Sequence, residues 1–181
     1  MKLPAEPLPR FGLGLVVVAV IIAAVLQVRM LLSRSHVDEA RSALNTFTEV
    51  LLEYRRHHGY LPGDVNRDGE IDAGEASYVA THLVRAGLIR SGADDLTAMV
   101  AGRPVTLRVI ARHASAVPNP PRGRNVIEMW NLPCKVAQEL DSRIDDGHLL
   151  KGNLRASVNA CSIGGANDPV PVVGFSLQSQ E

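Results

Sequence analysis

The sequence predicts an α+β fold, with one long N-terminal helix followed by short helices and a small sheet. Helical spacing of apolar residues continues well past an N-terminal apolar run, and residues 15–58 contain neither proline nor glycine. Short β-like runs begin only in the second half of the chain. The 181 residues, 46% of them hydrophobic, are enough for one domain with its own core.

An uncharged, largely apolar run covers residues 11–28. It approaches the ~20 apolar residues that cross a hydrocarbon core and exceeds the roughly 7–15 of a signal-peptide core. No small-x-small site follows, so a spanning helix is favoured over a cleaved signal peptide. Lys2 and Arg10 precede the run and predict a cytoplasmic N-terminus. The predicted parts are a leader-like segment at 1–10, a transmembrane helix at 11–31 and an exported globular domain at 32–181.

The long helix changes character after the apolar run. One face stays apolar at steps of three and four residues with polar residues between, which predicts an amphipathic half outside the membrane. Gly59 suits the position that closes a helix and Pro62 prevents its continuation, so the helix should end near His58. The residues of the apolar face are Val37, Ala40, Leu44, Phe47, Leu51 and Tyr54.

Shorter elements should follow the long helix. Glycine stops and a proline in a first turn predict helices over residues 76–88 and 133–144. Short runs of alternating or continuous apolar residues predict strands. These runs cover residues 105–110, 126–130, 154–158 and 170–175.

The most specific motif is DVNRDGEIDAGE at residues 64–75. It matches the calcium-loop pattern D-x-[DN]-x-[DN]-G-x5-E at every required position. Hard oxygens stand at alternate positions, Gly69 permits a sharp turn, and the last glutamate can close the shell with both carboxylate oxygens. Ile71 should anchor this EF-hand-like loop to the core. The predicted ligands are Asp64, Asn66, Asp68, the backbone carbonyl of Glu70, Asp72 (directly or through water) and Glu75.

The same acidic residues have a plainer interpretation, namely a solvated turn whose carboxylates favour the start of the next helix. Converging carboxylates are unfavourable without a cation, and the agreement with the pattern is complete, so we favour Ca²⁺. Residues 59–63 separate the loop from the preceding helix, and the chain has no second copy of the motif. We therefore expect a structural role for calcium rather than a switch.

The chain has two cysteines, Cys134 and Cys161, both in the portion that the predicted topology exports. An oxidising compartment favours a disulfide, which would stabilise the fold by roughly 3–4 kcal/mol. The alternative, a nucleophilic cysteine, needs an activating base, and no local pattern supplies one.

Composition and motifs argue against catalysis and against nucleic-acid binding. Lys+Arg and Asp+Glu both number 19, so no basic surface for nucleic acid is indicated. The six histidines lack ligand-like spacing, and no nucleophile, zinc or phosphate-loop motif is present. Asp145 and Asp146 stand just before Gly147 and fit a turn. We expect no enzyme and no small-molecule substrate.

Several segments resemble the bacterial type IV pilin-like superfamily, which includes the type II secretion pseudopilins. They are the apolar helix with ALNTFTEVLLEY (43–54), then GYLPGD (59–64), NRDGEI (66–71), HLVRAGLI (82–89), LDSRIDDG (140–147) and GNLRA (152–156). The resemblance implies a pilin-like fold, in which the amphipathic half of the helix packs on a small antiparallel sheet and the membrane half joins a filament core. It also implies a disulfide-closed segment from Cys134 to Cys161 and a surface rigidified by calcium.

By the same resemblance, the function would be assembly, as a minor pilin or pseudopilin of a type IV pilus or type II secretion machine. Partners would be other pilin-like subunits or secretion and pilus assembly proteins, and the location the bacterial inner membrane with a periplasmic globular domain. Arg10 and Leu15 depart from the family's processing-site glycine and its glutamate, which suits a position at a filament tip. The alternative is an unprocessed, membrane-tethered calcium-binding interaction module of the cell envelope.

Overall fold

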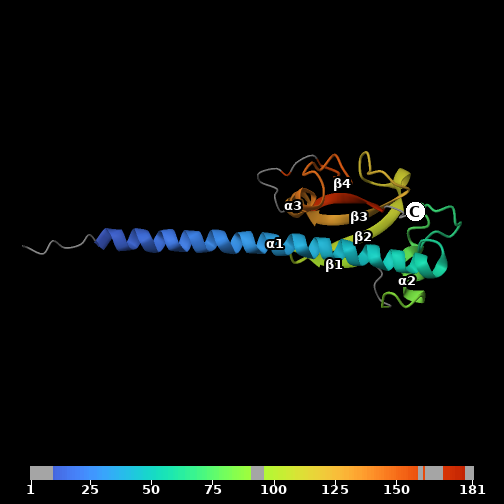
Figure 1. The fold of residues 1–181 in the computed structure, drawn as a ribbon, viewed down its shortest axis with the longest axis horizontal. Coiled ribbons are helices and arrows are strands. Elements are labelled where there is room, and N and C mark those ends of the chain that lie inside the picture. The colour runs from blue at the N-terminus through green and yellow to red at the C-terminus, as the bar shows by residue number, and fades with distance from the viewer. Residues whose placement is uncertain (1–9, 91–95, 159–160, 162–168, 178–181) are drawn as a thin grey trace, which may run out of the picture. The chain divides into compact units, whose positions relative to one another are not determined.

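The computed structural model describes residues 10–90, 96–158, 161 and 169–177 (Figure 1). The chain divides into two compact units, residues 1–35 and 36–181. Helix α1, Arg10–His58, contributes to both units. The predicted leader-like segment lies outside the described residues, apart from its last residue.

The predicted transmembrane helix at 11–31 is wrong. Among the described residues, no helix combines the length and the apolarity that crossing a membrane requires. This finding also corrects the fold prediction that included a membrane half, and the predicted single-pass location in the inner membrane.

The unit formed by residues 36–181 combines helices with one antiparallel sheet. Its helices are the C-terminal half of α1, then α2 (Tyr78–Arg85), α3 (Cys134–Ile144) and the short 3-10 helix η1 (Arg112–Ala114). Its strands are β1 (Thr97–Val100), β2 (Arg103–Ala111), β3 (Asn125–Pro133), β4 (Leu154–Ala156) and β5 (Pro169–Leu177). The strand order is β1-β2-β3-β5-β4, and each neighbouring pair is antiparallel.

The end of α1 and its apolar face agree with the predictions. The helix ends at His58, and Gly59 follows with a φ of +82°. Each predicted face residue is at most 6% exposed. These side chains share one core with residues of α2, of the acidic loop before it and of the sheet, so this half of α1 lies against the sheet (Figure 1).

The later elements match the predicted order but differ at their ends. α2 is shorter than predicted, because residues 73–77 form turns before it. Strand β1 was not predicted from the sequence. It is joined to β2 by Ala101 and Gly102, which have φ angles of +53° and +71°. Such a tight hairpin is usually marked by Asn-Gly or Asp-Gly, and Ala-Gly does not carry that signal.

Candidate metal centre

The acidic loop, residues 64–75, is fixed to the end of β2 and the start of β3. Asn125, the first residue of β3, is 3% exposed. Its Oδ1 accepts the Ile71 N–H at 2.9 Å, and its Nδ2 donates to the Gly69 carbonyl at 2.8 Å. The Ile71 carbonyl accepts the Ala111 N–H at 2.6 Å. The middle of the loop is therefore bonded directly to the sheet.

Ile71 anchors the acidic loop as predicted, since its side chain is fully buried in the shared core. Gly69 has a φ of +87°, a left-handed conformation that glycine adopts without strain. Ile71 thus faces the core, whereas Asn66 and Asp68 lie on the solvent side of the loop. This is the division of roles that a calcium loop needs.

Asp64, the first predicted ligand, has a buried carboxylate oxygen without a hydrogen-bond partner. The residue is only 1% exposed. Its Oδ2 accepts the Gly69 N–H at 3.1 Å, whereas its Oδ1 is buried and has no hydrogen-bond partner. A buried carboxylate oxygen without a partner is costly, and a bound cation would supply the missing partner. The residues present therefore fit a cation at this position.

Glu75, the last predicted ligand, reaches back across the loop. Its Oε1 accepts the N–H groups of Val65 and Asn66 at 3.1 and 3.2 Å, and its Oε2 accepts the Asp72 N–H at 3.1 Å. The side chain thus links the two ends of the loop. Calcium would draw both of these oxygens onto the ion, as the closing glutamate of such loops does.

Asn66 and Asp68, at the third and fifth positions of the loop, are hydrogen-bonded to each other. The Asn66 Oδ1 accepts the Asp68 N–H at 2.9 Å, and the Asn66 Nδ2 donates to the Asp68 Oδ2 at 2.8 Å. The Asp68 Oδ1 accepts the Glu70 N–H at 2.8 Å. These short-range bonds hold the loop in its turns and engage the Asn66 Oδ1 and both Asp68 carboxylate oxygens. Among the described residues of the loop, no three acidic side chains bring their oxygens within 4.8 Å of one another, so a bound cation would have to draw its ligands together.

His113 was not foreseen as part of this site. Its Nδ1 lies 3.3 Å from Glu70 Oε2, and its Nε2 lies 3.1 Å from Asp72 Oδ1. The Glu70 side chain is thus engaged with His113, which leaves its backbone carbonyl as the natural ligand. The contact also favours a water-mediated contribution from Asp72. No local spacing could have revealed His113, because it lies 38 residues beyond the end of the loop.

We expect Asn125→Ala to lower the free energy of unfolding by about 2 kcal/mol, because the Ile71 N–H and the Gly69 carbonyl lose their buried partner. Urea unfolding of the full chain measures this change. Asn45→Ala is the matched control, since Asn45 is exposed on α1. Equal stability of the two variants would contradict the role given to Asn125.

The predicted disulfide is confirmed, because Cys134 and Cys161 are bonded, with their Cα atoms 5.7 Å apart. Cys134 is the first residue of α3, so the bond ties the start of this helix to the segment before β5. This disulfide uses both cysteines of the chain, so the alternative of a nucleophilic thiol is wrong.

His82 supports the entry to the acidic loop. Its Nδ1 accepts the Gly63 N–H at 3.0 Å, and its ring is stacked on Tyr54 with centroids 6.0 Å apart. Burial lowers the pKa of His82, and the charges of Arg85 and His58 lower it further. Protonation would remove the acceptor that Gly63 uses, so the fold favours the neutral imidazole.

The lowered pKa of His82 predicts a loss of stability in acid. As pH falls below the ordinary value of 6.5, the unfolded chain takes up the proton before the folded chain does, so the free energy of unfolding decreases. Urea unfolding of calcium-free protein at about pH 7.5 and about pH 5.5 should show a smaller loss for His82→Gln than for the wild type. The control His57→Gln, at an exposed residue, should behave like the wild type. Equal losses in His82→Gln and the wild type would contradict this prediction.

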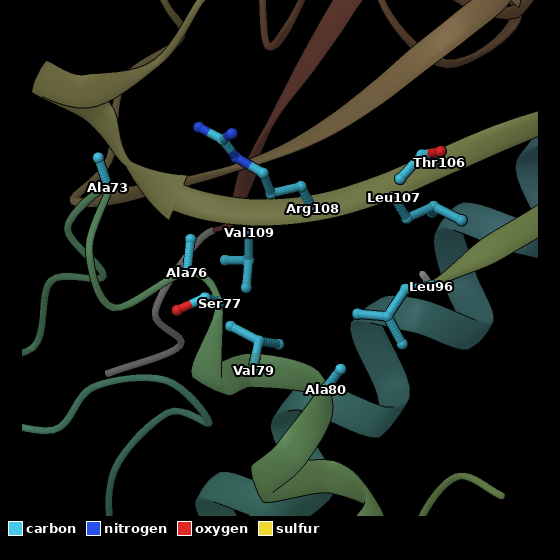
Figure 2. A pocket seen from close by; sticks show the side chains of 10 residues that line it. All are labelled: Ala73, Ala76, Ser77, Val79, Ala80, Leu96, Thr106, Leu107, Arg108 and Val109. Atoms are coloured by element: carbon cyan, nitrogen blue, oxygen red, sulfur yellow. The ribbon is translucent and has the colours of Figure 1, made fainter. Parts of the chain in front are cut away.

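A cavity of about 300 Å³ lies between α2 and β2 (Figure 2). Apolar side chains dominate its lining, and Figure 2 shows the Arg108 guanidinium directed away from Val79 and Ala80. The Ser77 hydroxyl donates to the Gly74 carbonyl at 3.0 Å rather than to a base. The residues that line this cavity therefore provide no pair of nucleophile and base.

Comparisons of the chain with protein-family models, with curated proteins and with solved structures gave no match.

Proposed function

We propose that this protein is a structural assembly subunit of the pilin-like kind, acting as a minor pilin or pseudopilin, with a globular unit held rigid by calcium in loop 64–75. The observation that carries the proposal is an exposed apolar stripe on α1. The partners would be the helices of other pilin-like subunits. The sequence resemblance supports the same conclusion from other residues.

The apolar stripe consists of four side chains at helical spacing, in steps of three, one and three residues. Such spacing places them on one face of the helix. Their exposure is between 47% and 56%, and Val20 on the opposite face is 62% exposed. Large apolar side chains gathered on a helix surface usually cover a partner. A second apolar helix fits such a stripe, because ridges of side chains pack into grooves. The stripe is Val18, Ile21, Ile22 and Val25.

Calcium would act on the other unit, at the junction between the end of α1 and the sheet. Loop 64–75 is bonded to β2 and β3, and the half of α1 before it lies in the same core. An ion held by this loop would fix the position of the loop relative to both elements. The support for this step is the buried, unpaired Oδ1 of Asp64. A rigid surface reduces the entropy lost when subunits associate.

Charge placed on the apolar stripe tests the proposal. We expect Ile22→Asp to reduce recovery of pilin-like subunits with the tagged full-length chain roughly tenfold or more, because a carboxylate would be buried without a partner. Val20→Asp is the matched control: Val20 is 62% exposed and lies on the opposite face of the helix. Equal losses in both variants would contradict the stripe as the contact surface.

Deletion of the gene tests the same proposal in the cell. A subunit of a pilus or secretion machine should be needed for surface filaments or for protein export. If both remain unchanged after deletion, the proposed function is wrong.

A further inference from the structure

A second group of acidic residues lies at the C-terminal end of α3. Asp141, Asp145 and Asp146 each offer a carboxylate oxygen, and these three oxygens lie within 4.8 Å of one another. Asp141 is in the last part of α3, and Asp145 caps the helix. In Figure 1, α3 lies toward the other end of the sheet from the acidic loop between α1 and α2. From the sequence, Asp145 and Asp146 were expected only to form a turn.

Asp141 has an unsatisfied carboxylate in the protein interior. Its relative exposure is 0%, and neither of its carboxylate oxygens has a hydrogen-bond partner. Burial, together with the charges of the Asp145 and Asp146 carboxylates, raises the pKa of Asp141 to about 6. Such a group needs either a proton or a cation, because a buried charge without a partner is strongly unfavourable.

Hydrogen bonds from main-chain N–H groups hold the Asp145 and Asp146 carboxylates in place, and each bonded carboxylate uses only one of its two oxygens. The Asp145 Oδ2 accepts the N–H groups of Asn153 and Leu154, and the Asp146 Oδ1 accepts the His148 N–H at 2.9 Å. Each side chain keeps its other oxygen outside these bonds. Gly152 allows this arrangement, because a Cβ atom there would collide with the Asp145 carboxylate.

We infer that Asp141, Asp145 and Asp146 bind a hard divalent cation, for which Ca²⁺ is the best fit. All the converging atoms are carboxylate oxygens, and calcium accepts irregular oxygen shells more readily than magnesium does. The ion would supply the partner that the Asp141 carboxylate lacks. It would also join the end of α3 to the turn before β4, so the globular unit would carry two calcium sites.

Calcium titration of the full chain by calorimetry tests this second site separately from loop 64–75. The background is Glu75→Gln, which weakens the loop. In that background the site at Asp141, Asp145 and Asp146 should still bind one calcium ion. Adding Asp146→Asn should abolish this binding. The variant should still fold, because Asp146 is exposed. Adding Asp141→Asn should have the same effect on binding. Adding Glu49→Gln, an exposed carboxylate on α1, is the control and should leave binding unchanged.

The melting temperature gives a second measurement in the same background. Calcium should raise it in Glu75→Gln and should not raise it in Glu75→Gln with Asp146→Asn. Binding that survives both Asp141→Asn and Asp146→Asn would overturn the inference. So would the absence of calcium binding from the folded Glu75→Gln chain while the wild type binds one ion, a result that leaves the site in loop 64–75 intact.

Discussion

Calcium should raise the melting temperature of the full chain through loop 64–75, and Glu75→Gln should remove that rise. The measurement is thermal unfolding in a chain that carries Asp146→Asn, so that the loop is examined alone. At an ion concentration one hundred times the dissociation constant, binding stabilises the folded state by about 2.7 kcal/mol. For a chain of this size, that corresponds to roughly 5–10 °C. The physical cause is the new partner for the buried Oδ1 of Asp64.

Asp64→Asn separates calcium binding from loop structure. The amide keeps an acceptor for the Gly69 N–H and removes the buried negative charge. Without calcium this variant should be at least as stable as the wild type. In the Asp146→Asn background, calcium should no longer raise its melting temperature. Glu49→Gln should respond to calcium as the wild type does. An equal calcium response in the wild type, Asp64→Asn and Glu75→Gln would rule out the loop as the site.

Loss of the disulfide should lower the free energy of unfolding by an amount similar to the stabilisation expected from calcium. The bonded cysteines are 27 residues apart, so removing the cross-link should lower the free energy of unfolding by roughly 3–4 kcal/mol in the chain-entropy model. The double substitution Cys134→Ser with Cys161→Ser, compared with the wild type by urea unfolding, measures this loss.

A reductant provides the internal control for the disulfide prediction. Reduced wild-type protein should unfold at nearly the same urea concentration as the double serine variant, and the variant should not respond to the reductant. A difference well below about 1 kcal/mol between oxidised and reduced wild type would contradict the prediction, since the cross-link then does not constrain the unfolded chain.

Features that depend on local spacing were predictable from the sequence. The apolar face of α1 follows from the helical period, and its end from Gly59 and Pro62. The acidic loop is recognisable because its candidate ligands occupy fixed positions within one short segment. The burial of Ile71 follows from the same pattern, which places an apolar anchor two residues after Gly69.

Features that depend on distant residues were not predictable in this way. Asn125 holds the loop from more than 50 residues away, and His113 approaches it from the strand-end helix η1. Asp141 looks like an ordinary polar residue of an amphipathic helix until the fold buries it. The apolar run at 11–28 was assigned to a membrane by its composition, and the helices of the described residues do not support that assignment.

The most direct test of a calcium-rigidified assembly subunit is recovery of partner subunits with the tagged full-length chain, in calcium and after chelation. The proposal predicts that pilin-like subunits accompany the wild type in calcium, and that recovery falls after chelation and in Glu75→Gln to a similar extent, while Glu49→Gln keeps its partners. Equal recovery under all these conditions would contradict a role for calcium in assembly. Absence of any pilin-like subunit from the folded wild-type chain would contradict the proposed function itself.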